Sequence, residues 1–334
     1  MRISYRVLIL ALVFSVPFSF SKAKANAKLK EVPVYLADPT IFYSNGIYFL
    51  YGTEPNPEIG FPVLVSKDLI KWNKPKEATN NGYALMKGKQ TFGSTGFWAP
   101  QVIAYKNKFY MLYTANENIA LAESNSPYGP FIQKKIGALP SNTKQIDPFL
   151  FIDEDGKKYL YHVKLGGGNK IFVAEFKDDF SGIREETLKE CISAEGGWED
   201  TGRIPAPPIV EGPTVLKHKG IYYLFYSAND FRNIDYAVGY ATSKSPMGPW
   251  TKNPDNPIIN RSVIGKNGTG HGDMFKDKKG NYYYVLHSHN SESDVLPRQT
   301  FIVGLTFKTN DQTKIDDIVL DKSRMIIPET HSIK

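Results

Sequence analysis

The sequence of 334 residues predicts an all-β fold, a five-bladed β-propeller, on the basis of a repeated segment and its spacing. Each copy has a polar opening, an apolar run, a turn at glycine or lysine, and an aromatic run. One shared position of the repeat is occupied in turn by Asp38, Ala99, Asp147, Glu211 and His271. Successive positions lie 61, 48, 64 and 60 residues apart. Because one four-stranded blade has about this length, five copies predict five blades.

The distance from this position to the turn residue sets the alignment of the copies. It is eight residues from Asp38 to Gly46 and nine residues from Glu211 to Gly220, and the other three copies also have nine. On this alignment Glu211 shares its position with Asp38.

The segments within each copy have the composition of strands. Runs such as Phe149–Ile152 and Ile221–Tyr226 are short, rich in aromatic or β-branched residues, and flanked by turn residues. Serine, proline and glycine recur at the same offsets in Ser124–Phe131 and Ser243–Trp250, where they predict turns between strands. Since no segment has a long apolar period of 3.6 residues, we expect few helices.

A propeller must also close its ring, and two segments outside the copies could supply the closing strand. One is Val32–Tyr35 and the other is Ile318–Met325, and the sequence leaves both open. The copies fill the chain from about Tyr35 to about Thr309, which leaves little room for a second domain. We therefore expect one propeller domain over residues 28–334.

Residues 1–25 predict a signal peptide. Arg2 and Arg6 precede the apolar stretch Val7–Phe20, and small residues at Ala25 and Ala27 offer cleavage sites. The apolar stretch is too short for a stable membrane anchor, and no cysteine near the cleavage site could carry a lipid. The sequence thus predicts an exported protein, periplasmic or extracellular.

The net charge and the cysteine count argue against a nucleic-acid partner and against an intrachain disulfide. The formal net charge of +7 falls to about +3 when Arg2, Arg6, Lys22 and Lys24 leave with the signal peptide, so no nucleic-acid partner is expected. The single cysteine, Cys191, excludes an intrachain disulfide, and we expect a half-buried thiol there.

Three carboxylates and a histidine at the repeated position indicate an active site. In a propeller the innermost strand of each blade begins near the central axis, so these residues converge on one funnel. Asp and Glu are rarely buried unless they are paired or used. The alternative is that the carboxylates cap turns, with Pro39 and Pro148 shaping the chain. Acidic residues at three of five equivalent positions favour the site.

The motifs Ala37-Asp-Pro39, Ile146-Asp-Pro148 and Val210-Glu-Gly-Pro213 together resemble those of glycoside hydrolase family 43, over nearly the whole mature chain. The resemblance implies a five-bladed catalytic propeller that cleaves α-L-arabinofuranosides and β-D-xylosides of plant cell walls with inversion. It also implies a role for each acid: Asp38 as general base, Glu211 as general acid, and Asp147 as the carboxylate that orients the acid and tunes its pKa.

Inverting chemistry requires this division between the acids. One protonated carboxyl group must face the leaving oxygen, and one ionised carboxylate must activate water across the sugar ring. A third carboxylate near Glu211 disfavours its ionisation and raises its pKa, while Asp38 stays ionised if it is solvated or hydrogen-bonded.

Other candidate residues have weaker support. Trp98 resembles the tryptophan of the family's Trp-Ala-Pro motif, and we expect it and its neighbour Phe97 to contact the sugar, with a core position as the alternative. Arg298 resembles a fifth-blade arginine that contacts substrate, with a surface salt bridge as the alternative. His271 resembles a histidine beside a metal ion in the central channel, so it could bind calcium together with waters, in a structural role.

The sequence therefore predicts an inverting, exo-acting glycoside hydrolase that releases α-L-arabinofuranose or β-D-xylose from arabinan, arabinoxylan or xylan fragments. No organic cofactor is expected. Two alternatives stay open, an endo-acting arabinanase and a catalytically inert propeller that binds carbohydrate or protein. The loops around the funnel decide between exo and endo action.

Overall fold

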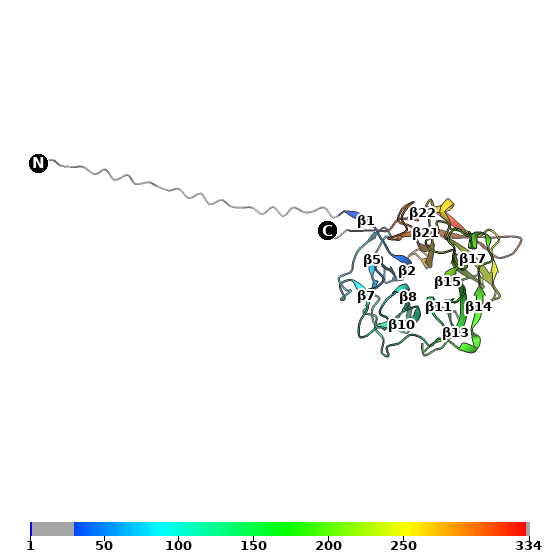
Figure 1. Ribbon diagram of the computed structural model, residues 1–334, viewed down its shortest axis with the longest axis horizontal. Coiled ribbons are helices and arrows are strands. Elements are labelled where there is room, and N and C mark those ends of the chain that lie inside the picture. The colour runs from blue at the N-terminus through cyan, green and yellow to red at the C-terminus, as the bar shows by residue number, and fades with distance from the viewer. Residues whose placement is uncertain (2–29, 332–334) are drawn as a thin grey trace.

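The structure is a computed structural model that describes Met1 and residues 30–331. Five antiparallel sheets surround a common centre, and each sheet begins with its innermost strand (Figure 1). The predicted all-β, five-bladed propeller is confirmed. Apart from Met1, the predicted signal peptide lies outside the described residues and stays a prediction.

The blades follow one another in chain order. Blade 1 contains β2 (Ala37–Ser44), β3 (Ile47–Thr53) and β5 (Leu64–Ser66). Blade 2 contains β8 (Trp98–Tyr105), β9 (Lys108–Ala115) and β10 (Asn118–Ser124). Blade 3 contains β11 (Gln145–Ile152), β12 (Lys158–Leu165), β13 (Asn169–Phe176) and β14 (Lys189–Ile192). Blade 4 contains β15 (Val210–His218), β16 (Ile221–Ala228), β17 (Ala237–Ser243) and β18 (Thr251–Lys252). Blade 5 contains β19 (Gly270–Lys276), β20 (Tyr282–Ser288), β21 (Gln299–Lys308) and β22 (Asp317–Ile326).

The remaining elements are short. One small sheet pairs β4 (Gly60–Pro62) with β7 (Tyr83–Met86), and another contains β1 (Glu31–Pro33), β23 (Glu329–His331) and β6 (Lys71–Trp72). The described part of the chain has one four-residue helix, α1 (Arg261–Ile264), and two 3-10 turns, η1 (Glu185–Thr187) and η2 (Gly197–Glu199). Within that part, no helix has the length and apolar character needed to cross a membrane. Cys191 is half-buried, as predicted.

The hydrophobic core lies between neighbouring blades, which explains the aromatic runs of the repeat. In β16, Tyr222, Leu224 and Tyr226 pack against blade 3, whereas Tyr223 and Phe225 pack against blade 5. Alternate residues of a strand point to opposite faces of its sheet. A strand that is covered on both faces therefore has a continuous apolar sequence.

The second of the two candidate segments supplies a strand to the last blade. Ile318–Met325 lies in β22, the fourth strand of blade 5. Val32 and Pro33 instead lie in β1, which pairs with β23, and β23 runs parallel to β6 beside blade 1.

Each innermost strand has a β-bulge near its start, where two of its residues oppose one residue of the second strand. The first residue of the bulge has a positive φ in every blade. These φ values are 47° for Asp38, 45° for Ala99, 55° for Asp147, 60° for Gly212 and 38° for His271. The five-fold repeat of the sequence is thus a five-fold repeat of a backbone distortion that re-aims side chains.

The position predicted for Glu211 in the repeat is wrong by one residue. Gly212 has the positive φ, and Glu211 pairs with Ser227 just before the bulge, as Ala37 pairs with Thr53 in blade 1. Two-residue turns follow in both blades, so Gly212 to Gly220 and Asp38 to Gly46 are equally eight residues. A Cβ atom at position 212 would lie 2.8 Å from the ring of His271, which explains the glycine.

Candidate active site

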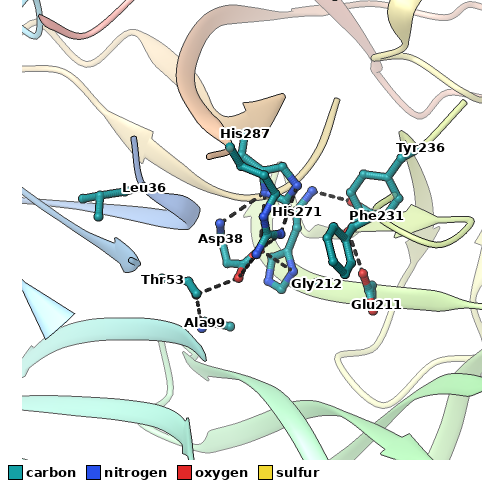
Figure 2. A network of polar contacts seen from close by, with 12 residues as sticks. Leu36, Asp38, Thr53, Ala99, Glu211, Gly212, Phe231, Tyr236, His271 and His287 are labelled. Carbon is teal, nitrogen blue, oxygen red and sulfur yellow. Dashed lines mark hydrogen bonds and ion pairs between the residues drawn. The ribbon is translucent and has the colours of Figure 1, made fainter. Parts of the chain in front are cut away.

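The innermost strands bring Asp38, Asp147, Glu211 and His271 to one pocket of about 310 Å³. They come from β2, β11, β15 and β19, and hence from four different blades. Nδ1 of His271 lies 3.4 Å from Oδ1 of Asp38 and 3.8 Å from Oδ2 of Asp147. Figure 2 shows His271 between Asp38 on one side and Glu211 on the other. The predicted site residues therefore converge, although Glu211 reaches the pocket from a different register position.

Asp38 is a buried carboxylate that is surrounded by hydrogen-bond donors. Arg298 Nη1 donates to Oδ1 at 3.0 Å, and the Thr53 hydroxyl donates to Oδ2 at 2.6 Å. Burial acting alone would raise the pKa of Asp38. The positive charge of Arg298, assisted by His271 and His287, instead holds this pKa well below its usual range. Asp38 is therefore ionised at neutral pH.

Glu211 shares the pocket but has neutral partners. The Tyr236 hydroxyl donates to Oε1 at 2.8 Å, and Asn169 Nδ2 donates to Oε2 at 3.2 Å. Burial, followed by the negative charge of Asp147, raises the pKa of Glu211 to about 7. Glu211 therefore keeps a proton into the neutral range.

Asp147 contacts the strand that carries Glu211. Its Oδ2 accepts a hydrogen bond of 3.1 Å from the amide of Gly212, the residue that follows Glu211. Burial and the nearby charge of Asp38 raise the pKa of Asp147 as well. Asp147 and Glu211 thus form a coupled pair that holds a proton near neutral pH.

Two of the three predicted substrate contacts line the pocket. They are Trp98, which is half-buried, and Arg298, whose guanidinium also lies 4.6 Å from the ring centroid of Phe231. Their contact with substrate stays a prediction.

The prediction for Phe97 is wrong. Its side chain is fully buried, with its ring centroid 5.9 Å from that of Phe61 and 6.2 Å from that of Tyr113. Neighbouring residues of an extended chain point in opposite directions. With Trp98 at the pocket, the preceding side chain enters the core.

Several neighbours of the acids were not predicted from the sequence. Phe231 and Tyr236 belong to the loop between β16 and β17, and Glu54 follows β3 and lines the pocket. His287 lies near the end of β20. Only His287 had a signal in the sequence, because the second strands of the five copies can be aligned as the first strands were.

The calcium ion predicted beside His271 stays a prediction. Calcium takes six to eight oxygen ligands, but within residues 30–331 no three His, Cys, Asp or Glu side chains form a group arranged to bind a metal ion. The cavity beneath the acids, lined by His271, Pro148 and Pro213 among others, has about 20 Å³, enough for about one water molecule. These residues do not fit a calcium site, so no chemical step proposed below depends on one. Elemental analysis before and after EDTA treatment tests the ion.

Comparison with known proteins identifies the family. Residues 32–313 match glycosyl hydrolases family 43. A solved structure described as an endo-1,4-beta-xylanase from Bacteroides thetaiotaomicron is similar, with a TM-score of 0.81 and 39% identity over 92% of this chain and 100% of that chain.

Several relatives were found by sequence, and two of them illustrate the range of activities. Beta-D-galactofuranosidase xynD of Aspergillus niger is 28% identical over 76% of this chain and 74% of its own length. A xylosidase/arabinosidase of Butyrivibrio fibrisolvens is 26% identical over 75% of this chain and 49% of its own length. Since the family match spans most of the sequence and the fold agrees, the chain belongs to glycosyl hydrolase family 43.

Proposed function

We propose that this chain is an inverting, exo-acting glycosidase that releases α-L-arabinofuranose or β-D-xylose from arabinan, arabinoxylan or xylan fragments. The observation that carries the proposal is the contrast between two carboxyl groups of one pocket. Arg298 keeps Asp38 ionised, while the pKa of Glu211 is raised to about 7. An inverting glycosidase needs one carboxyl group in each of these states.

In the proposed reaction, Asp38 takes a proton from a water molecule as the water oxygen attacks the anomeric carbon. Glu211 gives its proton to the glycosidic oxygen, and the bond between that oxygen and the anomeric carbon breaks. The products are the free sugar with inverted configuration and the shortened chain. Asp38 is then protonated and Glu211 ionised, and proton exchange with solvent restores both. Arg298 and Asp147 contribute by setting the charges of the two groups beforehand.

The size of the pocket supports exo action. Its volume of about 310 Å³ lies at the lower end of the range for small-molecule sites, which suits a terminal sugar better than a long chain. Glu54, Pro57 and Leu296 are among the residues that line the pocket. Endo action is the second candidate, because the similar structure from Bacteroides thetaiotaomicron is described as an endo-xylanase.

The name of one relative supports arabinose or xylose as the sugar that is released. One of these relatives is a xylosidase/arabinosidase, and another is a beta-D-galactofuranosidase, which adds a further furanose to the substrates worth testing.

Product analysis tests the proposal. Purified protein is incubated with arabinan, arabinoxylan and xylo-oligosaccharides, and with aryl α-L-arabinofuranoside, β-D-xyloside and β-D-galactofuranoside. Monosaccharide as the only early product, released with inverted configuration in proton NMR, is the expected result. Early oligosaccharides would favour endo action, and net retention would contradict the role of Asp38. No turnover of any substrate, with Asp38→Asn as the negative control, would favour an inert binding protein.

We also propose export to the periplasm or the extracellular space, on the basis of Arg2, Arg6 and the apolar stretch Val7–Phe20. The exported protein should begin at residue 26 or 28. A protein retained in the cell with residues 1–25 intact would contradict this.

A further inference from the structure

A repeated hydrogen bond joins neighbouring blades at the bulges. The amide of the bulge residue donates to a side chain near the end of the second strand of the preceding blade, and we call this contact the amide cap. The amide of Ala99 donates to Thr53 Oγ1 at 3.0 Å. The amides of Asp147 and His271 donate to the hydroxyls of Thr114 at 3.0 Å and Ser227 at 2.7 Å.

The strand pairing shows that five residues occupy this capping position. Each is the partner of the last residue before the bulge: Thr53, Thr114, Val163, Ser227 and His287. Val163 cannot accept a hydrogen bond, and the amide of Gly212 donates to Asp147 Oδ2 instead. In blade 5 the capping residue is His287, whose Nδ1 lies 3.2 Å from the amide of Asp38.

His287 makes further contacts besides the one with the Asp38 amide. Its Nδ1 also lies 3.3 Å from Oδ1 of Asp38, and its Nε2 lies 3.3 Å from Nη1 of Arg298. The imidazole is fully buried and stacks on the ring of Tyr236, with centroids 5.7 Å apart and an angle of 15°. Tyr236 in turn donates to Glu211. One ring thus connects the surroundings of Asp38 with those of Glu211 (Figure 2).

The imidazole supports Asp38 in either neutral tautomer. Burial and the charge of Arg298 lower the pKa of His287 to about 3, so the ring carries a single N–H at neutral pH. With hydrogen on Nδ1, the ring donates to the Asp38 carboxylate and Nε2 accepts from Arg298. With hydrogen on Nε2, Nδ1 accepts from the amide of Asp38, but Nε2 can then no longer accept from Arg298. Both arrangements restrain the residue that we propose as the base.

We propose that His287 is a positioning residue for the reaction. It holds the carboxylate of Asp38 and the guanidinium of Arg298 in a fixed position relative to Tyr236 and Glu211. This inference rests on the proposed function. Geometry explains why blade 5 departs from Ser or Thr: a hydroxyl would cap the Asp38 amide but would reach neither Arg298 nor the face of Tyr236.

The other blades supply the test substitution. His287→Thr installs the capping residue of blades 1 and 2, so its hydroxyl can accept from the Asp38 amide, while the contacts with Arg298 and the Tyr236 ring are lost. We expect kcat to fall about 10- to 100-fold, because displacements of about 1 Å at a reacting group have effects of this size. The loss should be equal on natural and aryl substrates, since Asp38 acts on water whatever group departs. His162→Thr, which replaces a buried histidine of β12 outside the pocket, is the matched control and should retain kcat.

Each result decides the inference. A kcat within about twofold of wild type in folded His287→Thr would overturn it, because His287 would then be an amide cap only. If His287→Thr does not fold, His287→Asn is measured instead, with the same expected loss and the same contradicting result.

Crystal structures of wild type and variant separate this inference from the proposed function. Displaced Asp38 and Arg298 side chains in the variant would support it even if the wild type cleaved none of the tested sugars, a result that would contradict the proposed function alone. Unchanged side chains would overturn it.

Discussion

The two carboxyl groups proposed to catalyse the reaction lie in one pocket but in opposite electrostatic surroundings. Around Asp38 the structure places a guanidinium, two imidazoles and a hydroxyl, all directed at the carboxylate. Around Glu211 it places a phenol, an amide and the carboxyl group of Asp147.

This difference shows that burial by itself does not assign the role of a carboxyl group. Burial is the largest influence on the pKa of both residues and acts in the same direction on both. Arg298 reverses the effect at Asp38, while Asp147 adds to it at Glu211. The identity of the neighbours therefore decides which carboxyl group is ionised at neutral pH.

The strongest test removes the ionised group. Asp38→Asn should lower kcat by about 10³- to 10⁴-fold, because an amide cannot accept the proton of water. The loss should be the same for natural substrates and for aryl glycosides with good leaving groups, measured by steady-state kinetics. Asp155→Asn, an exposed residue of the turn between β11 and β12, is the control and should behave as wild type. A loss confined to natural substrates would place the general acid at Asp38.

The second test removes the protonated group. Glu211→Ala should lower kcat on natural linkages by about 100-fold or more, since the departing oxygen needs a proton. A dinitrophenyl glycoside should be affected much less, because dinitrophenolate departs without protonation. Kinetics on both substrates measure the difference. If both lose activity equally, Glu211 is not the acid.

A third test concerns the charge next to the acid. The general acid acts while protonated, so activity falls as pH rises through its pKa, near 7 in this structure. Asp147 and Glu211 form a coupled pair, and repulsion between their carboxylates opposes loss of the last proton. Asp147→Asn removes this repulsion, so the basic limb of the kcat/KM profile should shift to lower pH. Asp155→Asn should leave the limb unchanged. An unchanged limb or an upward shift would contradict the effect of the Asp147 carboxylate on the pKa of Glu211.

The smallest effects concern stability. The folded pKa of Glu211 is raised above the ordinary value of 4.5, so its contribution to stability is present below about pH 4.5 and is lost as pH rises toward 7. The free energy of unfolding of Glu211→Gln should therefore be about 1 to 3 kcal/mol higher than that of wild type at pH 8, with little difference near pH 4.5.

The lowered pKa of Asp38 gives the opposite sign, because its contribution is present above the ordinary value of 3.8 and is lost as pH falls. Asp38→Asn should thus be less stable than wild type at pH 8. Denaturant titrations of both variants at the two pH values provide the measurement. Changes of the same sign at pH 8 would contradict the contrast between the two surroundings.

The sequence by itself determined the five blades and the convergence of the acids. Both follow from local patterns that repeat, namely strand composition, turn residues and the motifs around Asp38 and Asp147. In a propeller, one repeat unit has one orientation toward the axis, so equivalent positions must meet.

Only the tertiary structure decided the register of Glu211 and the neighbours of each acid. The backbone of Gly212 and the pairing of Glu211 with Ser227 depend on a bulge that spacing to a turn does not show. Phe97 and Trp98 are adjacent in sequence yet face the core and the pocket. Arg298 is 260 residues from Asp38, and His287 is 249 residues away. Charge states depend on such contacts across blades, because electrostatic interactions act through space and no local pattern along the chain records them.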